Sequence, residues 1–336
     1  MTILNGEQGA RVMSEAFKDP TRLIDSFTGK HSFLSNFERR PFTYAGAPCP
    51  TAEHGFNADK TLDPDQRAHV MAAPTPGEAK RRGRAVTLRP GWDDRVRYEV
   101  MTAVLAAKFT DPDLREQLLG TGDALLIEST TWHDQVWGDC GCDKHRAWPG
   151  KNRLGLELMA LRGALRGDPP DRWTRVAVTG HRPQFLTPNQ QTWAQGELDR
   201  LAVKLRDRHG TKVAITGAAL GSDTWWARSA VRADLDVWAY IPFLDQAAKW
   251  ADEDKVTWRA LLGVATRTLI LGAGYNVGLL HSRNDFMLRD ADLVIAVWDP
   301  TKTTGGTASA VSKARAAGKT LVVVDVTSRT TRIERR

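Results

Sequence analysis

Short, uninterrupted apolar runs recur through the second half of the chain, and they constrain its fold more than any other feature. They lie at 176–179, 213–216, 237–241, 293–297 and 321–324. Runs of this length without polar alternation are typical of strands that are buried on both faces of a parallel sheet. Apolar residues at helical spacing, such as Ala194, Leu198 and Leu201, lie between the first two runs. The pattern predicts a doubly wound α/β sheet.

The clearest domain boundary is the stretch 166–172, which reads Arg-Gly-Asp-Pro-Pro-Asp-Arg. Before it, leucines at helical spacing predict a helix that Gly167 and the two prolines must end. The chain of 336 residues is also long for a single core. We therefore predict an α+β, mainly helical domain at 1–166, a linker at 167–174, the doubly wound domain at 175–328 and a basic tail at 329–336.

Composition points to a globular protein, with 41% hydrophobic and 26% charged residues. No apolar run approaches the ~20 residues that a membrane span needs, and the N-terminus lacks the pattern of a signal peptide. We expect a cytoplasmic protein with no membrane partner. The formal net charge of +7 arises within 171–336, partly in the basic tail, which we interpret as a solvated tail in preference to a site for a polyanion.

The three cysteines, Cys49, Cys140 and Cys142, are too few for a disulfide framework. Cys140-Gly-Cys142, with His145 nearby, resembles one corner of a metal site, but a zinc site would require a second pair at standard spacing. We predict two thiols in a loop, no metal site and no cofactor.

Three glycine-containing turns follow strands of the expected sheet, at 179–183, 217–223 and 305–307. Carboxyl ends of parallel strands are where such sheets bind ligands, and glycines let backbone N–H groups approach a phosphate. None of the turns matches the dinucleotide pattern G-x-G-x-x-G, which disfavours an NAD-dependent dehydrogenase. The three turns together predict a nucleotide or sugar-phosphate site.

This half resembles the SLOG superfamily of Rossmann-like domains over about 176–325, and most closely its YpsA-like branch. The matching motifs are V-T-G-H-R-P (178–183), G-x-x-x-G-S-D-T-W (217–225), I-P-F (241–243) and D-x-V-I-A-V-W-D with G-G-T (292–307). The related LOG phosphoribohydrolases carry a Glu after this G-G-T motif, which is absent after Thr307, so the resemblance favours ligand binding over hydrolysis. The candidate nucleotide-binding residues are Thr179, Gly180, His181, Arg182, Gly217, Gly221, Ser222, Asp223, Gly305, Gly306 and Thr307.

In the first half, a helix is expected to begin after Thr51, the candidate N-cap. Glu53 and Lys60 would then project from one helix face, Glu53 as an exposed first-turn carboxylate; a salt-bridged surface is the structural alternative. Lys108 falls on the apolar side of a second helical stretch, where it either reaches out to solvent or becomes a neutral, nucleophilic amine. A third cluster, 127–155, is rich in tryptophans, carboxylates and glycines and predicts a loop around a pocket.

These stretches resemble the NADAR (YbiA-like) family from about residue 27 to 162. The matching motifs are F-T-G-K-H-S-F-L-S-N-F (27–37), P-T-A-E-H-G-F (50–56), A-x-K (58–60), R-P-G-W (89–92), A-K-F (107–109), L-I-E (126–128), W-H-D-x-x-W-G-D (132–139) and G-K-N-R-L-G-x-x-L-M (150–159). The resemblance implies N-glycosidase chemistry on ribose conjugates, either ribosylamino intermediates of the riboflavin pathway or ADP-ribose linked to guanine. The loop 140–148 is longer than is typical for the family, so the substrate class transfers less directly.

The resemblance also implies functional residues. Glu53, Lys60, Lys108 and Asp134 are the catalytic candidates, and either lysine fits an imine to the ribose C1. The candidate substrate-binding residues are Phe33, Ser35, Asn36, His54, Trp92, Trp137, Gly138 and Asn152.

Breaking an N-glycosidic bond requires negative charge near C1 and a proton for the departing base. Glu53 or Asp134 can supply either, so we expect an N-glycosidase that needs no metal, acting on a small ribose or ADP-ribose conjugate, with a nucleotide at the second domain. The alternatives are a non-catalytic sensor or sponge for NAD-derived nucleotides, and a hydrolase of ADP-ribosylated nucleic acid. A homo-oligomer is compatible with each of these functions.

Overall fold

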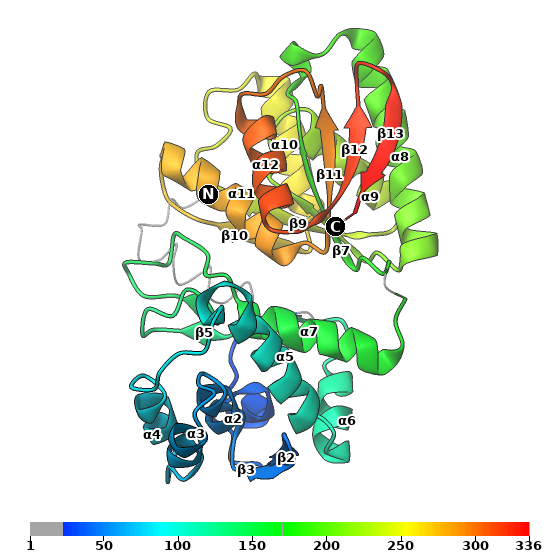
Figure 1. The fold of residues 1–336 in the computed structure, drawn as a ribbon. Coiled ribbons are helices and arrows are strands. Elements are labelled where there is room, and N and C mark those ends of the chain that lie inside the picture. Colours follow the sequence, from blue (N-terminus) through cyan, green and yellow to red (C-terminus); the bar gives the residue numbers. More distant parts are fainter. Residues whose placement is uncertain (1–22, 170, 336) are drawn as a thin grey trace. The chain divides into compact units, whose positions relative to one another are not determined.

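The computed structural model describes residues 23–169 and 171–335, which form two compact units (Figure 1). Of the described residues, the first unit holds 23–143 together with Gly150–Asp168, and the second holds Lys144–Pro149, Pro169 and 171–335. Within the described residues, no helix combines the length and the apolar character that crossing a membrane requires.

The first unit is mainly helical. Its helices are η1 (Gly29–Leu34), α2 (Ala52–Ala58), α3 (Pro64–Met71), α4 (Pro76–Arg82), η2 (Trp92–Val96), α5 (Arg97–Lys108), α6 (Pro112–Gly120) and α7 (Arg153–Arg166). Its short strands pair two by two: β1 (Leu23–Ile24) with β4 (Leu125–Leu126), β2 (Phe42–Tyr44) with β3 (Ala47–Cys49), and β5 (Ser129–Thr130) with β6 (Asp139–Cys140). Thr51 is confirmed as the N-cap of α2, since its side chain accepts a hydrogen bond from the His54 backbone.

The second unit contains a seven-stranded sheet in the order β10-β9-β8-β7-β11-β12-β13. Its strands are β7 (Arg175–Gly180), β8 (Val213–Thr216), β9 (Asp236–Ile241), β10 (Arg267–Ile270), β11 (Leu293–Trp298), β12 (Thr320–Asp325) and β13 (Thr330–Glu334). The helices are η3 (Pro183–Phe185), α8 (Pro188–His209), α9 (Ser222–Arg232), α10 (Asp252–Val264), α11 (Val277–Asp290) and α12 (Gly306–Ala316). All strand pairs in this sheet are parallel except β12–β13. All five predicted apolar runs lie in strands.

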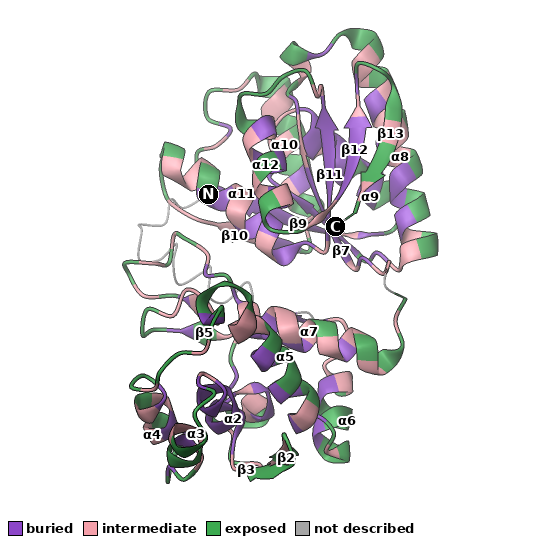
Figure 2. Cartoon of the chain, in the orientation of Figure 1, coloured by how far each residue is buried: buried purple, intermediate pink, exposed green. Residues whose placement is uncertain are grey.

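Helices cover both faces of the sheet, so its inner strands are buried (Figure 2). Val176 and Val178 of β7 belong to the same core cluster as Leu198 of α8 and Trp226 of α9. Ala177, between the two valines, is also buried and points to the opposite face. This two-sided burial explains why the runs lack polar alternation.

The C-terminal segment differs from the expected solvated tail. Thr330–Glu334 forms the edge strand β13, antiparallel to β12. Its β-branched residues suit a strand, and Glu334 forms an ion pair with Arg315 of α12 at 3.0 Å. Arg335, after the strand, forms an ion pair with Asp171 at 2.8 Å, so the basic charge of this segment is partly compensated within the second unit.

Strand β7 lies between β8 and β11: the chain runs outward from β7 through β8, β9 and β10, and then returns to β11 on the other side of β7. The strand order thus reverses next to β7. In open α/β sheets such a reversal separates the loops at the carboxyl ends of the two strands and creates a ligand crevice.

Candidate functional site

The first unit contains a cavity of about 380 Å³. Carboxylates, cations and aromatic rings share its wall. The lining residues are Phe27, Thr28, Ser35, Asn36, Phe37, Glu53, Phe56, Asn57, Lys60, Lys80, Arg84, Met101, Glu128, Ser129, Trp132, Asp134 and Trp137.

Glu53 reaches this cavity from the first turn of α2. Its backbone N–H donates to the carbonyl of Asn36 at 3.0 Å, and its Oε1 accepts from Asn57 Nδ2 at 2.9 Å. The expectation of an exposed carboxylate is wrong, because only 7% of Glu53 is exposed. Burial raises the pKa of Glu53, although the charge of Lys80 and the hydrogen bond from Asn57 oppose the shift.

Glu128 lies in the same wall, just beyond β4. Its backbone N–H donates to Asn152 Oδ1 at 3.0 Å, and Asn152 Nδ2 in turn donates to the Leu126 carbonyl. Burial, together with the negative charges of Asp134 and Glu53, raises the pKa of Glu128 to about 7. Glu128 was not among the candidate catalytic residues, although the motif L-I-E contains it.

Asp134 is fixed by the backbone of its own loop. Its Oδ1 accepts hydrogen bonds from the N–H groups of Val136 and Trp137, each at 2.9 Å. The cavity thus contains three carboxyl groups, two of which influence the protonation of Glu128.

Lysines and an arginine complete the polar part of the wall. Lys60 follows the end of α2, and burial lowers the pKa of its amine. Its Nζ lies 5.7 Å from the centre of the Phe56 ring. Lys80 and Arg84, from α4 and the residues after it, were not among the candidates; in the sequence they belong to a basic run without a motif.

Lys108 does not line the cavity, and it does not reach solvent. Only 1% of it is exposed, and its Nζ donates to the carbonyls of Phe33 at 2.7 Å and Ser35 at 2.8 Å. Burial lowers the pKa of this amine to about 7. The buried amine of Lys108 has a local structural role. Helix η1 ends at Leu34, and Lys108 donates hydrogen bonds to two backbone carbonyl groups near this helix end. It supports the wall formed by Ser35 and Asn36.

The candidate substrate-binding residues divide into two groups. Ser35, Asn36 and Trp137 line the cavity, whereas Phe33, His54, Trp92, Gly138 and Asn152 do not. Trp92 packs on Phe56 at 5.2 Å between ring centres, and Phe56 packs on Trp137 at 5.1 Å.

Two of the residues that do not line the cavity have clear structural roles. His54 contacts Thr51 Oγ1 and the Ala73 carbonyl through its two ring nitrogens. Gly138 approaches the backbone so closely that a Cβ would lie 2.5 Å from the Glu128 carbonyl oxygen. The sequence motifs therefore contain both residues that line this cavity and residues that support its wall.

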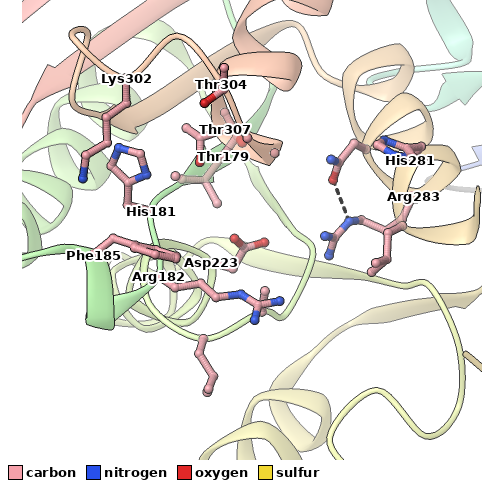
Figure 3. Close-up of a pocket in the computed structure, with 18 residues that line it drawn as sticks. Thr179, His181, Arg182, Phe185, Asp223, His281, Arg283, Lys302, Thr304 and Thr307 are labelled. Carbon is pink, nitrogen blue, oxygen red and sulfur yellow. Dashed lines mark hydrogen bonds between the residues drawn. The ribbon is translucent and has the colours of Figure 1, made fainter. Parts of the chain in front are cut away.

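The second unit contains a cavity of about 510 Å³ at the carboxyl ends of β7 and β11 (Figure 3). Eight of the candidate nucleotide-binding residues line it: Thr179, Gly180, His181, Arg182, Asp223, Gly305, Gly306 and Thr307. Residues that the sequence did not single out also line it, among them Phe185, His281, Arg283, Asn284, Lys302 and Thr304.

Gly217, Gly221 and Ser222 support this second cavity without lining it. Ser222 Oγ donates to the His181 carbonyl at 3.0 Å. The Gly217 N–H donates to Asp223 Oδ1 at 2.7 Å, and its carbonyl accepts from Arg283 Nη1. The turn at 217–223 therefore positions Asp223 and Arg283 at the cavity.

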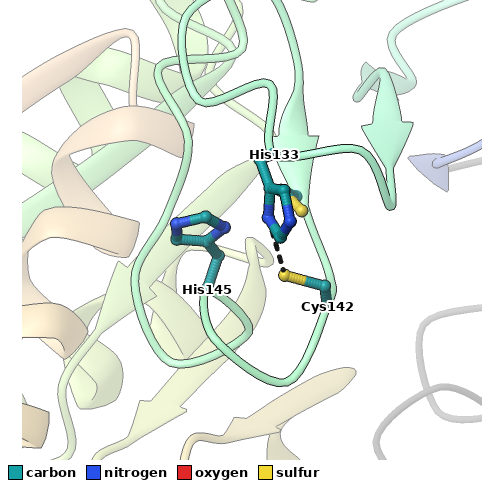
Figure 4. Close-up of side chains that lie close together, drawn as sticks. His133, Cys142 and His145 are labelled. Carbon is teal, nitrogen blue, oxygen red and sulfur yellow. Dashed lines mark hydrogen bonds between the residues drawn. The ribbon is translucent and has the colours of Figure 1, made fainter.

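The loop after β5 brings four potential metal ligands together, which differs from the expected pair of isolated thiols. Its members are His133, Cys140, Cys142 and His145 (Figure 4). His133 is the donor that sequence spacing missed, because it lies before Cys140 and outside any standard cysteine or histidine pair.

A cavity with three carboxyl groups beside indole rings defines a site of the type that glycoside-cleaving enzymes use. The sequence profile of the NADAR domain family matches residues 24–166. The chain is 42% identical over 135 residues to N-glycosidase YbiA of Escherichia coli (strain K12), which covers 39% of this chain and 80% of YbiA. It is 38% identical over 139 residues to N-glycosidase Npun_R5314 of Nostoc punctiforme, covering 40% of this chain and 85% of that protein.

A third relative is the riboflavin biosynthesis protein VVA0006 of Vibrio vulnificus, 36% identical over 143 residues, which are 42% of this chain and 37% of that protein. The NMR structure of E. coli YbiA matches with 34% identity and a TM-score of 0.38, covering 46% of this chain and 92% of YbiA. Through its first unit the chain belongs to the NADAR family. Its relatives support a glycosidase enzyme.

Proposed function

We propose that the first unit hydrolyses the N-ribosidic bond of a ribose conjugate, either a ribosylamino compound or an ADP-ribose adduct of a base such as guanine. The observation that carries this proposal is the juxtaposition of Glu53, Glu128 and Asp134 around one cavity. The cavity also offers Trp132 and Trp137, whose rings suit a planar base.

Hydrolysis breaks the bond between C1 and the base nitrogen, and the base leaves with a proton. Water then adds its oxygen to C1 and releases a proton, so that atoms and charge balance. With a pKa of about 7, Glu128 holds a proton over much of the neutral range and serves as the general acid. Glu53 or Asp134 provides the negative charge that stabilises the cationic sugar and accepts the proton of water.

A covalent route through Lys60 is an alternative within the same site. Its amine would attack C1 of the ring-opened conjugate and displace the base nitrogen, which leaves with a proton, so that an imine joins Lys60 to the sugar. Water would then hydrolyse this imine and release the sugar and the free amine. Because burial lowers the pKa of Lys60, a larger fraction of its amine is neutral and nucleophilic than at an exposed lysine. Lys108 has both of its hydrogen bonds committed to backbone carbonyls and supports the wall instead.

The cations of the wall favour a phosphate-bearing substrate. Lys80 and Arg84 lie on the same cavity as the three carboxyl groups, and neither amine nor guanidinium is needed to break the glycosidic bond. They would bind a phosphate or diphosphate group. The name of the Vibrio relative supports a ribosylamino substrate of riboflavin biosynthesis, while a diphosphate would favour ADP-ribose.

A panel of substrates tests the proposal. Purified protein would be incubated with ribosylaminopyrimidine phosphates, ADP-ribosyl-guanine DNA, NAD and cyclic ADP-ribose, and products would be identified by mass spectrometry. We expect release of the free base from one class and loss of release in Glu53→Gln, which keeps an acceptor for Asn57. Absence of turnover on every member, with tight binding of one, would instead support a non-catalytic sensor or sponge.

For the second unit we propose a SLOG-like, Rossmann-like nucleotide-binding domain. What supports this is the cavity beside β7, where the strand order reverses, together with Arg182, Lys302 and the N-terminus of α12 around it. The absence of a Glu after Thr307 favours binding over hydrolysis.

A nucleic acid that carries ADP-ribose is an alternative substrate, and it would suit the basic charge of residues 171–336. The ADP-ribosyl-guanine DNA in the substrate panel tests this alternative.

A further inference from the structure

The ligand atoms of His133, Cys140, Cys142 and His145 all lie within 4.8 Å of one another. Cys140 is buried, Cys142 and His145 are half-buried, and His133 is exposed. Figure 4 shows the side chains of His133, Cys142 and His145 directed toward one another. The group takes no part in either cavity described above.

Backbone pairing creates this arrangement. Strands β5 and β6 place Cys140 opposite Thr130, and the Gly141 N–H donates to the Thr130 carbonyl at 2.9 Å. The chain turns after Cys140, which brings Cys142 Sγ to 3.4 Å from His133 Nδ1. His133 itself adopts a left-handed backbone conformation, with φ of 66°. The cluster is thus a product of the fold of one continuous segment.

The donor set has a clear metal preference. Two thiolates and two imidazoles are soft and borderline ligands that suit zinc, whereas calcium and magnesium take oxygen ligands. Donor atoms of a tetrahedral zinc site lie about 3.3–3.8 Å apart, given its bond lengths of ~2.0–2.3 Å. Closing the four donors around one ion therefore requires movements of roughly 1 Å, within the reach of side-chain rotation in a loop.

We propose that His133, Cys140, Cys142 and His145 bind one Zn²⁺ ion. Four protein ligands fill a tetrahedral shell, so the ion is structural and leaves no open position for substrate. His133 lies between Trp132 and Asp134 in the sequence, and both neighbours line the cavity of the first unit. The ion would fix this segment and thereby hold the indole and the carboxylate in place. Zinc binding itself does not depend on the proposed glycosidase activity.

The test measures metal content of the full-length protein. Protein purified with a reducing agent and supplied with Zn²⁺ is expected to retain one equivalent after gel filtration, and Co²⁺ in its place should give the visible spectrum of a tetrahedral thiolate site. Cys142→Ser and His145→Ala should each lose the stoichiometric metal. The matched control is His69→Ala, which removes an exposed histidine of α3 and should retain it.

A second readout follows the thiols. Chelation of the ion should make Cys142 react faster with a thiol reagent, while the fully buried Cys49 serves as an internal reference. Failure to bind added Zn²⁺ or Co²⁺ under reducing conditions would overturn the proposal. So would equal metal retention in wild type and in a Cys142→Ser/His145→Ala double variant, or a disulfide between Cys140 and Cys142 that persists with reductant.

Discussion

Glu128 has the electrostatic environment that a general acid needs. Its pKa of about 7 means that the proton required by a departing base is present below neutral pH and lost above it. We expect kcat/KM to fall as pH rises through about 7, and Glu128→Gln to lower kcat by about 10²–10⁴-fold and remove this basic limb. The measurement is a pH–rate profile of both proteins.

Glu157→Gln is the matched control for this prediction, because Glu157 lies on α7 and accepts a hydrogen bond from Thr102 outside the cavity. It should leave the profile unchanged. A Glu128→Gln variant with the wild-type basic limb would assign the acid to another residue.

The different positions of Lys60 and Lys108 predict different results for these two lysines in a trapping experiment. If the covalent route operates, borohydride added during turnover should attach the sugar to Lys60, which lines the cavity, and leave Lys108 unmodified. Peptide mapping by mass spectrometry distinguishes the two sites. Full turnover by Lys60→Met, with no adduct in wild type, would eliminate the imine and leave direct attack by water.

The buried amine of Lys108 leads to a prediction about the pH dependence of stability. Its pKa is about 7 in the folded protein and 10.5 as the ordinary value, so between these pH values the unfolded state binds more protons. The contribution of Lys108 to stability should therefore increase as pH rises from 7 toward 10. We expect the free energy of unfolding of wild type relative to Lys108→Met to increase between pH 6 and 9, measured by urea denaturation. A constant difference would show that the amine stays charged in the folded protein throughout this pH range.

At the scale of elements, the packing of α4 against α2 maintains the position of Glu53. A Cβ at Gly83, the C-cap of α4, would lie 2.5 Å from Asn57 Oδ1, and Asn57 donates to Glu53. We expect Gly83→Ala to displace Asn57, destabilise the protein by about 1–3 kcal/mol and reduce turnover. Thermal unfolding and the base-release assay measure the two effects.

Gly77→Ala provides the control from the same helix. No heavy atom lies within 4 Å of a Cβ at Gly77, and alanine favours the helix over glycine by up to about 1 kcal/mol. It should preserve activity and raise stability slightly. Equal behaviour of the two variants would show that the α2–α4 contact does not control the site.

The helices and strands also show which parts of the fold can be predicted from the sequence and which cannot. Strands buried on both faces left continuous apolar runs, so β7, β8, β9, β11 and β12 were predictable. Strands β10 and β13 lie at the two edges and are less buried, so they carry no such run. Likewise, the surroundings of Lys108 and the approach of His133 to Cys142 depend on chain packing that spacing does not encode.

For the whole molecule, the two cavities suggest a division of labour in which one unit cuts a ribose conjugate and the other binds a related nucleotide. Each cavity combines cationic side chains with groups suited to sugars or phosphates. If the roles are separate, a change in the second cavity should abolish ligand binding there without affecting the chemistry of the first. This requires a variant that blocks the second cavity and leaves the fold intact.

Gly306→Val meets that requirement. Gly306 begins α12 and lines the cavity, and a Cβ there would meet no heavy atom within 4 Å, so valine fits the fold while occupying space that a phosphate would enter. We expect wild-type protein to bind ADP-ribose or an adenine nucleotide at this unit with micromolar affinity, about −8 kcal/mol, measured by calorimetry. Gly306→Val should lose this binding and retain base release, whereas Gly263→Val, at an equally open position of α10 away from the cavity, should retain both. Because Lys80 and Arg84 of the first cavity would bind the phosphates of the same ligand, the titration is repeated in a Lys80→Ala/Arg84→Ala double variant to identify binding that depends on the second unit. Unchanged binding in Gly306→Val would remove the nucleotide from this cavity and leave the seven-stranded unit with a structural role.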